Sequence, residues 1–241
     1  MLMSFICGYP IGAKLVGELY KSGDITKDEA KTIIALSSTS GPIFVIGAVG
    51  AGLYHSATLG GIIFLVHIVS SLIIGILFAY KKKKSTEDSS PALKKDNFIK
   101  PNLLEDATSS TFYSVLTVAV YVSIFYMFID MAIDLNILKY LEKLIVCILK
   151  LINIPQDCAT GLASGLVEMT RGCKDLSTLT NPTLLLSITS GLISFSGVSI
   201  IMQSMAFLSG TQISTKYFLS IKLCQFIVSI VLGAFVGLLI F

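Results

Sequence analysis

The chain has 241 residues, of which 54% are hydrophobic and only 14% are charged. Soluble domains carry about 25% charged residues, so this composition argues against a soluble domain and predicts a polytopic protein of the lipid bilayer. The formal net charge of +3 is too small to predict a nucleic-acid partner. The five cysteines include no C-x-x-C pair, and neither histidine has a metal-ligand spacing, so we expect no metal site and no bound cofactor.

Residues 1–80 are predicted to form a first structural repeat. Residues 1–12 are apolar but too short to cross a bilayer, which takes about 20 residues. Glycines on both sides of Pro10 interrupt any helix there, so we expect half of a hairpin. Thr26 and Glu29 then have the spacing of a capping box, which predicts that a helix starts directly after Thr26.

A helix over residues 33–54 is long enough to cross the bilayer, but Ser40, Gly41 and Pro42 lie in its middle. Proline removes a backbone donor and disfavours helix at the residue before it, so we predict a broken helix at membrane depth. Such a break is tolerated where it is buried in protein or lines a cavity. The alternative is a packing kink, with the hydroxyls bonded back to the helix.

The middle of the chain is predicted to hold simpler elements. Residues 57–80 form an intact spanning helix, in which His67 makes an interhelical hydrogen bond or, alternatively, relays protons. Residues 81–103 form a loop whose excess of lysine predicts a cytoplasmic location. Residues 104–154 contain a connecting transmembrane helix and an amphipathic helix over 136–152, which lies in the interface or crosses obliquely.

Residues 155–241 are predicted to form a second repeat. Its hairpin, residues 157–181, is rich in glycine and contains Glu168. An ionisable residue at membrane depth is costly and marks a functional site by default. A broken helix over residues 183–207 and an intact helix over residues 216–241 complete the repeat.

The two repeats share one order of elements, which is a glycine-punctuated hairpin, a broken helix and an intact helix. Ser40 and Gly41 align with Ser196 and Gly197. Since lysine-rich loops face the cytoplasm, the two copies are expected to have opposite orientations. The predicted fold class is therefore an all-α polytopic membrane protein, with an inverted repeat of re-entrant hairpin, broken helix and intact transmembrane helix. Such repeats place a binding site at the membrane midplane.

Three ordered motifs resemble a known family: GYPIGAKL at residues 8–15, SGPIFVIG at residues 40–47 and GLVEMTRG at residues 165–172. They are similar to the sporulation integral membrane proteins with nucleoside-recognition (gate) domains. The resemblance implies a fold related to the transport domain of concentrative nucleoside transporters. It also implies a role in spore formation, where sporulation-specific members are linked to moving dipicolinic acid across the outer forespore membrane. Full-length relatives carry further N-terminal transmembrane segments, so a truncated member is implied as well.

The predicted function is a permease for a small, anionic organic solute, which the resemblance identifies as dipicolinic acid. Glu168 would bind a coupling cation, a substrate donor or Arg171, and Arg171 and Lys14 would attract carboxylates if they face the cavity. A pair of Glu168 and Arg171 that only caps the hairpin is the structural alternative. Coupling to H⁺ or Na⁺ and assembly as a homo-oligomer stay open. The predicted substrate site comprises Gly8, Tyr9, Pro10, Lys14, Ser40, Gly41, Pro42, Glu168, Thr170, Arg171, Ser196, Gly197, Ser199 and Gln203.

Other classes of function remain as alternatives. One is a nucleoside-type or other small-solute permease, and another is a membrane assembly protein for spore formation that transports nothing. An enzyme is not expected, because a serine hydrolase using His67 would lack both a G-x-S-x-G elbow and a second catalytic group.

Overall fold

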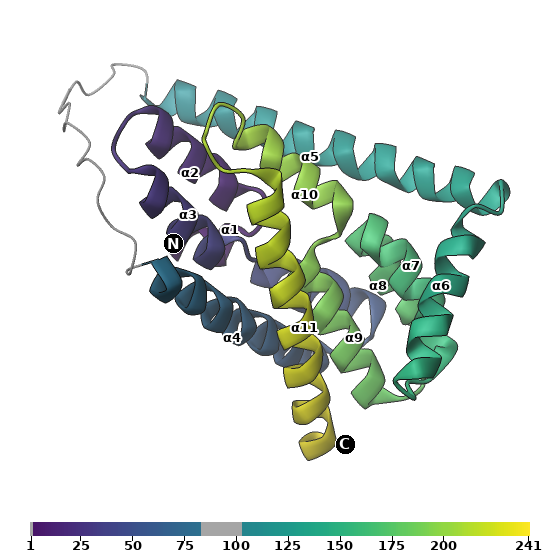
Figure 1. Cartoon of the computed structure of the whole chain (residues 1–241). Coiled ribbons are helices and arrows are strands. Elements are labelled where there is room, and N and C mark those ends of the chain that lie inside the picture. Colours follow the sequence, from purple (N-terminus) through teal and green to yellow (C-terminus); the bar gives the residue numbers. More distant parts are fainter. Residues whose placement is uncertain (1, 83–102) are drawn as a thin grey trace.

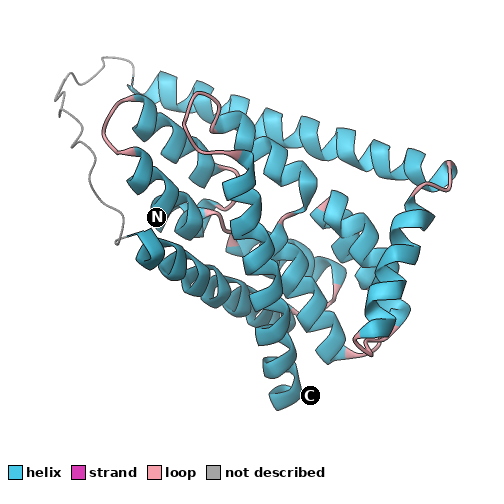
Figure 2. Ribbon diagram, in the orientation of Figure 1, coloured by secondary structure: helices cyan, strands magenta, loops and turns pink. Residues whose placement is uncertain are grey.

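The computed structural model describes residues 2–82 and 103–241 (Figure 1). Every regular element in these two ranges is a helix (Figure 2), which confirms the predicted all-α class. Most of the loop predicted over residues 81–103, together with its cytoplasmic location, lies outside the described residues. Within the described residues, four segments are long and apolar enough to cross a membrane: Ala57–Tyr80, Thr108–Asp134, Pro182–Phe207 and Thr215–Ile240.

The N-terminal part consists of a short helix pair, an interrupted helix and a long helix. These elements are α1 (Leu2–Cys7), α2 (Ile11–Lys21), α3 (Lys27–Ser37), η1 (Ile43–Leu53) and α4 (Ala57–Lys82). Residues 38–42 separate α3 from η1, within the range of the predicted broken helix. The capping box is confirmed, because Thr26 Oγ1 accepts a hydrogen bond from Glu29 N (3.2 Å) and Glu29 Oε2 accepts one from Thr26 N (2.8 Å). Hydrogen bonds from the Thr26 backbone and hydroxyl lower the pKa of the Glu29 carboxyl.

Helix η1 is a π-helix, in which an N–H group bonds to the carbonyl five residues back. At its end, Tyr54 N donates in this way to Val49 O (3.0 Å). Helices of this type are rare and are often found at functional sites. η1 lies directly on α4, because Gly50 and Gly60 let the two backbones meet, and a Cβ added at Gly50 would lie 2.5 Å from Gly60 Cα.

The two halves of the chain are connected by α5 (Leu103–Asp134) and α6 (Leu138–Leu151). α5 runs along one edge of the molecule (Figure 1), and only 11% of its most apolar stretch is buried, which suits a lipid-facing helix. α6 is amphipathic, as predicted, and buries Leu138 and Ile145 on one side. Its 14 residues extend over about 21 Å, less than the hydrocarbon core of about 30 Å, so an interfacial position is favoured over an oblique crossing.

The C-terminal part again contains a short helix pair, an interrupted helix and a long helix. Its elements are η2 (Gln156–Cys158), α7 (Ala159–Val167), α8 (Met169–Leu176), α9 (Pro182–Phe195), α10 (Gly197–Phe207) and α11 (Thr215–Ile240). α7 and α8 meet at Glu168, whose extended backbone (φ −137°, ψ 118°) ends one helix and starts the next. α9 ends and α10 begins at Ser196 and Gly197, with φ angles of 80° and 73°, within the range of the predicted broken helix. Left-handed backbone is uncommon at a serine, so Ser196 marks a sharp end of α9.

Helix α9 lies at the centre of the bundle, against α11 and α4. In the most apolar stretch of Pro182–Phe207, 89% of the residues are buried. Two glycines of α11 allow the close approach. A Cβ added at Gly233 would lie 2.8 Å from Ser187 Cα. One added at Gly237 would lie 3.0 Å from Thr183 Cα. Small residues four positions apart bring helix backbones together in membranes, and here they hold the interrupted helix in the interior of the protein.

Replacing Gly233 tests this contact. Gly233→Ala places a methyl group against the backbone of Ser187, which has no flexible end to give way. We expect the free energy of unfolding to fall by about 1–3 kcal/mol. Gly61→Ala in α4 is the matched control, since a Cβ there meets open space, and the helix propensity of alanine should keep or raise stability by up to about 1 kcal/mol. Thermal unfolding in detergent micelles measures both variants, and equal melting temperatures would contradict the close contact of α9 with α11.

Candidate functional site

A cavity of about 580 Å³ lies beside the α3–η1 break and the α7–α8 junction. Its wall is built by α1 and the link to α2, the α3–η1 break, η1, α5, the α7–α8 junction and α10. Both helix pairs and both interrupted helices therefore contribute to one hollow. Most of its wall is apolar, with a few polar groups among them, as is usual in small-molecule sites. The lining residues are Ile6, Cys7, Gly8, Tyr9, Ser40, Gly41, Ile43, Phe44, Ala48, Val118, Val122, Glu168, Met169, Thr170, Ile200 and Gln203.

The cavity collects part of the predicted substrate site, whose role in binding stays a prediction. The predicted residues that line it are Gly8, Tyr9, Ser40, Gly41, Glu168, Thr170 and Gln203. The predicted residues that do not line it are Pro10, Lys14, Pro42, Arg171, Ser196, Gly197 and Ser199. A smaller cavity of about 300 Å³ beside α1, α2 and α3 has none of the predicted residues in its described wall.

In both halves, a glycine with a positive φ angle lets a helix pair touch a helix break. Gly8 (φ +74°) lies so close to the α3–η1 break that an added Cβ would be 2.4 Å from Gly41 N. Gly197 (φ +73°) lies against the α7–α8 junction. A Cβ added there would be 3.1 Å from Met169 N and 3.2 Å from Val167 O. Glycine adopts this backbone without strain and leaves room for the contact, so these two glycines set the separation of the cavity walls.

Glu168 is fully buried and caps α8. Its Oε1 accepts a hydrogen bond from Thr170 N (3.0 Å) and its Oε2 accepts one from Arg171 N (2.8 Å). The N-terminus of a helix carries a partial positive charge, which stabilises a carboxylate placed there. In the part of the chain that the structure describes, the backbone of α8 therefore compensates the charge of Glu168 without an ion-pair partner.

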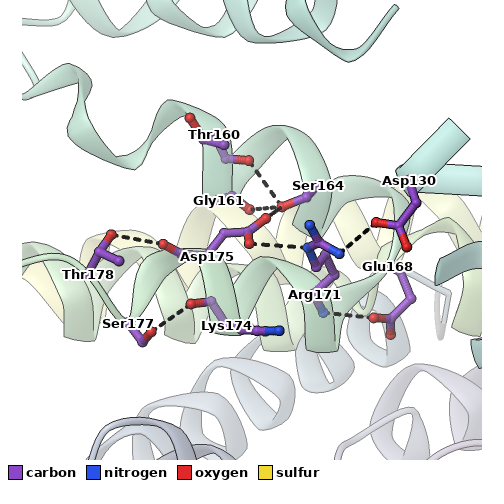
Figure 3. Close-up of polar contacts among 10 residues, drawn as sticks. All are labelled: Asp130, Thr160, Gly161, Ser164, Glu168, Arg171, Lys174, Asp175, Ser177 and Thr178. Carbon is purple, nitrogen blue, oxygen red and sulfur yellow. Dashed lines mark hydrogen bonds and ion pairs between the residues drawn. The ribbon is translucent and has the colours of Figure 1, made fainter. Parts of the chain in front are cut away.

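The side-chain pair of Glu168 and Arg171, one of the alternatives for this carboxylate, does not form (Figure 3). The Arg171 guanidinium binds Asp130 of α5 (Nη1–Oδ1, 2.9 Å) and Asp175 one turn further along α8 (Nε–Oδ1, 3.2 Å). Asp175 also accepts a hydrogen bond from Ser164 Oγ of α7 (2.6 Å). Because two carboxylates hold its guanidinium, Arg171 ties α8 to α7 and α5 and presents no cation to the cavity.

Lys14 is also engaged away from the cavity. Its Nζ donates to Ser110 O (3.1 Å), to the Ser110 hydroxyl and to Ser114 Oγ (2.9 Å), all on α5. With Lys14 and Arg171 both held by α5, the described lining of the cavity includes no lysine or arginine. The condition for these two residues to attract carboxylates, that they face the cavity, is therefore not met by their side-chain positions.

His67 makes interhelical hydrogen bonds, as predicted. Its Nε2 accepts a hydrogen bond from Ser40 N at the α3–η1 break (2.9 Å), and its Nδ1 lies 2.8 Å from Ser194 Oγ at the end of α9. Because Nε2 accepts, we assign the ring proton to Nδ1, which then donates to Ser194. Ser194 Oγ lies 2.6 Å from Ser229 Oγ of α11, which in turn lies 2.6 Å from Ser70 Oγ. Hydrogen-bonded side chains of α4, α9 and α11 thus connect the α3–η1 break with the end of α9.

Lys222 of α11 is a residue that the sequence reasoning missed. Its fully buried ammonium donates to Ser38 O (2.8 Å), Tyr9 Oη (2.9 Å) and Ser194 O (3.4 Å). A signal was present in the sequence, since a lysine inside an apolar span is costly and indicates function. Its partners at the helix breaks could not be read from that signal.

The chain is similar to a curated protein of spore formation. It is 28% identical to the sporulation integral membrane protein YlbJ of Bacillus subtilis (strain 168), over 93% of the chain and 60% of that protein. The chain is a homologue of this sporulation protein. Together with the four membrane-length segments, this relationship supports a multi-pass integral membrane protein. No family model and no solved structure matches the chain.

The chain spans about 60% of the length of this curated relative. The nucleoside-recognition domain and the truncation that the motifs imply stay predictions.

Removing the Glu168 carboxylate tests its role as a cap. Glu168→Ala leaves two N–H groups of α8 without their acceptor, so we expect the free energy of unfolding to fall by about 1–3 kcal/mol. Asp157→Ala, which removes an exposed carboxylate from the same part of the chain, should change it by no more than about 0.5 kcal/mol. Unfolding curves in detergent micelles measure both. If Glu168→Ala unfolds like the wild type, the capping role is wrong.

Proposed function

We propose that this chain forms the solute-binding core of a sporulation membrane transport protein, with a small organic solute held at the helix breaks. The observation that supports this most directly is the cavity of about 580 Å³, to which both helix pairs and both interrupted helices contribute. Small-molecule sites have volumes of about 300–1,000 Å³ and mainly apolar walls with a few polar groups. A membrane assembly protein without transport activity would not require helix breaks that share a cavity.

The proposed architecture is the inverted repeat of re-entrant hairpin, broken helix and intact helix, related to nucleoside-recognition domains. α1 to α4 would be one copy and α7 to α11 the other. The same order of elements occurs in both, and in each a positive-φ glycine, Gly8 or Gly197, lies where the helix pair meets the break. In secondary transporters of this kind, discontinuous helices hold the solute near the midplane while one repeat moves against the other.

Dipicolinic acid, moved across the outer forespore membrane, is the solute that the family resemblance implies. It is a small aromatic dicarboxylate, so its ring suits the apolar wall and its carboxylates require donors. Thr170 and Gln203 in the wall carry hydroxyl and amide donors. The Lys222 ammonium lies directly behind the wall, where it is hydrogen-bonded to Tyr9 Oη.

An uncharged, nucleoside-type solute is the second candidate, and the lining of the cavity favours it. Glu168 lies in the wall, whereas Lys14 and Arg171 are held by α5. The Oε1 atom of Gln203 is buried without a hydrogen-bond partner among the described residues. A nucleoside offers hydroxyl and N–H donors for such acceptors and a base for the apolar wall.

Uptake by proteoliposomes that contain the chain tests the proposal. We expect one of two labelled solutes, dipicolinate or uridine, to accumulate with time, and parallel assays of both decide between the two candidates. Val118→Trp fills the cavity from α5 and should abolish uptake. Val120→Trp lies on the exposed side of α5 and should leave uptake at the wild-type rate.

Binding of the solute provides a second readout of the same proposal. A solute at 100 times its Kd raises the free energy of unfolding by about 2.7 kcal/mol, which a melting curve detects. If neither solute accumulates and neither raises the melting temperature, the transport proposal fails and the membrane assembly role is favoured.

A further inference from the structure

The buried ammonium of Lys222 lies where the two interrupted helices stop. Ser38 is the residue at the C-terminal cap of α3, and Ser194 is in the last turn of α9. Lys222 Nζ donates to the backbone carbonyls of both, at 2.8 and 3.4 Å. The last carbonyls of a helix carry a partial negative charge and lack partners within the helix. Lys222 therefore joins the negative ends of two helices.

Oxygen atoms and aromatic rings, rather than a carboxylate, surround this ammonium. The Tyr9 hydroxyl is its third oxygen partner (2.9 Å), and the rings of Tyr9 and Phe218 lie with their centroids 4.4 and 5.8 Å from Nζ. The titratable groups around it are Tyr9, from the α1–α2 link, and His67 of α4, whose ring centroid lies 6.5 Å from that of Tyr9. None of the ion pairs between described residues includes Lys222.

Backbone carbonyls at helix breaks, supplemented by a hydroxyl, are also the ligands of a free cation. In secondary transporters, unwound backbone and the C-terminal ends of half-helices coordinate the coupling Na⁺ or H⁺. Here the same type of oxygen shell is occupied by a cation that is covalently part of α11. Tyr9 connects it to the solute site, because its hydroxyl binds Lys222 while the residue lines the cavity.

We infer that the Lys222 ammonium is a tethered cation that takes the place of a free coupling cation at the two helix breaks. The chain therefore binds no Na⁺ at this position. A second consequence, which rests on the proposed transport function, is that solute uptake does not depend on a Na⁺ gradient.

Melting temperatures in sodium chloride and in choline chloride of equal ionic strength test the tethered cation without any transport assay. The wild-type chain should melt at the same temperature in both salts. Lys222→Ala should melt roughly 5 °C lower in choline, because two buried carbonyls and a hydroxyl lose their donor. Methylammonium or Na⁺, which fit the vacated shell, should restore most of that loss. Lys216→Ala, at an exposed position of the same helix, should show neither the loss nor the recovery.

Several results would overturn the inference. One is a wild-type chain that Na⁺ stabilises relative to choline, which means that a free cation is still bound. Another is a Lys222→Ala protein that no small cation restores. If Lys222→Ala does not fold, Lys222→Met, which keeps the stem of the side chain, replaces it. A melting temperature of Lys222→Met equal to that of the wild type contradicts the need for a cation, and a lower one supports it.

Uptake measurements separate this inference from the proposed function. Solute uptake that requires a Na⁺ gradient contradicts the tethered cation but leaves transport intact. Equal uptake with and without Na⁺ supports both. Absence of uptake, combined with the expected melting temperatures, contradicts transport alone and supports the tethered cation.

Discussion

Where a helix is interrupted at membrane depth, lipid offers no partners for the freed backbone groups, which must be satisfied within the protein. Buried side chains such as Glu168, His67 and Lys222 do this at the breaks of the described structure. Glu168 accepts hydrogen bonds from the first N–H groups of α8, His67 accepts one from Ser40 N, and Lys222 donates to the carbonyls of Ser38 and Ser194. Each charge suits the helix end that it faces, since the carboxylate caps an N-terminus and the ammonium lies at two C-termini.

These same contacts shape the cavity. Glu168 caps α8, Ser40 lies at the α3–η1 break, and both line the cavity. Tyr9 lines it too and binds Lys222 through its hydroxyl. His67 and Lys222 belong to α4 and α11, which enclose α9 through close contacts such as that of Gly233 with Ser187. The position of the solute site is therefore set by the requirement to satisfy broken backbone in a tightly packed core. The groups available to a solute are those that this requirement leaves free, such as Gln203 Oε1.

The helix breaks could be predicted from the sequence because their causes are local. Pro42 lacks a backbone donor, Ser196 and Gly197 adopt left-handed backbone, and Thr26 with Glu29 forms a capping box within four residues. The same local chemistry directed attention to Glu168, an acidic residue between glycine-rich helices. The structure places Glu168 in the wall of the same cavity as Ser40 and Gly41, the residues before Pro42.

The destinations of the long charged side chains could not be predicted, because their partners lie far along the chain. Lys14 bonds to hydroxyls 96 and 100 positions away, and Arg171 bonds to Asp130, 41 positions away. Lys222 reaches the Ser38 carbonyl across 184 positions. Sequence periodicity indicates which face of a helix is apolar, but it does not indicate which helix is packed against that face. The sequence therefore indicates neither that α5 binds Lys14 and Arg171 nor that Lys222 lies at the breaks.

The central claim is that the cavity at the helix breaks is the solute site, and two native cysteines allow a direct measurement. Cys7 lines the cavity, whereas Cys147 is exposed on α6 and serves as an internal control. The rate of alkylation of each, followed by peptide mass spectrometry, is compared with and without dipicolinate or uridine. We predict that one of these solutes slows the alkylation of Cys7 and leaves that of Cys147 unchanged. If a solute that proteoliposomes take up leaves the rate of Cys7 alkylation unchanged, the claim is contradicted.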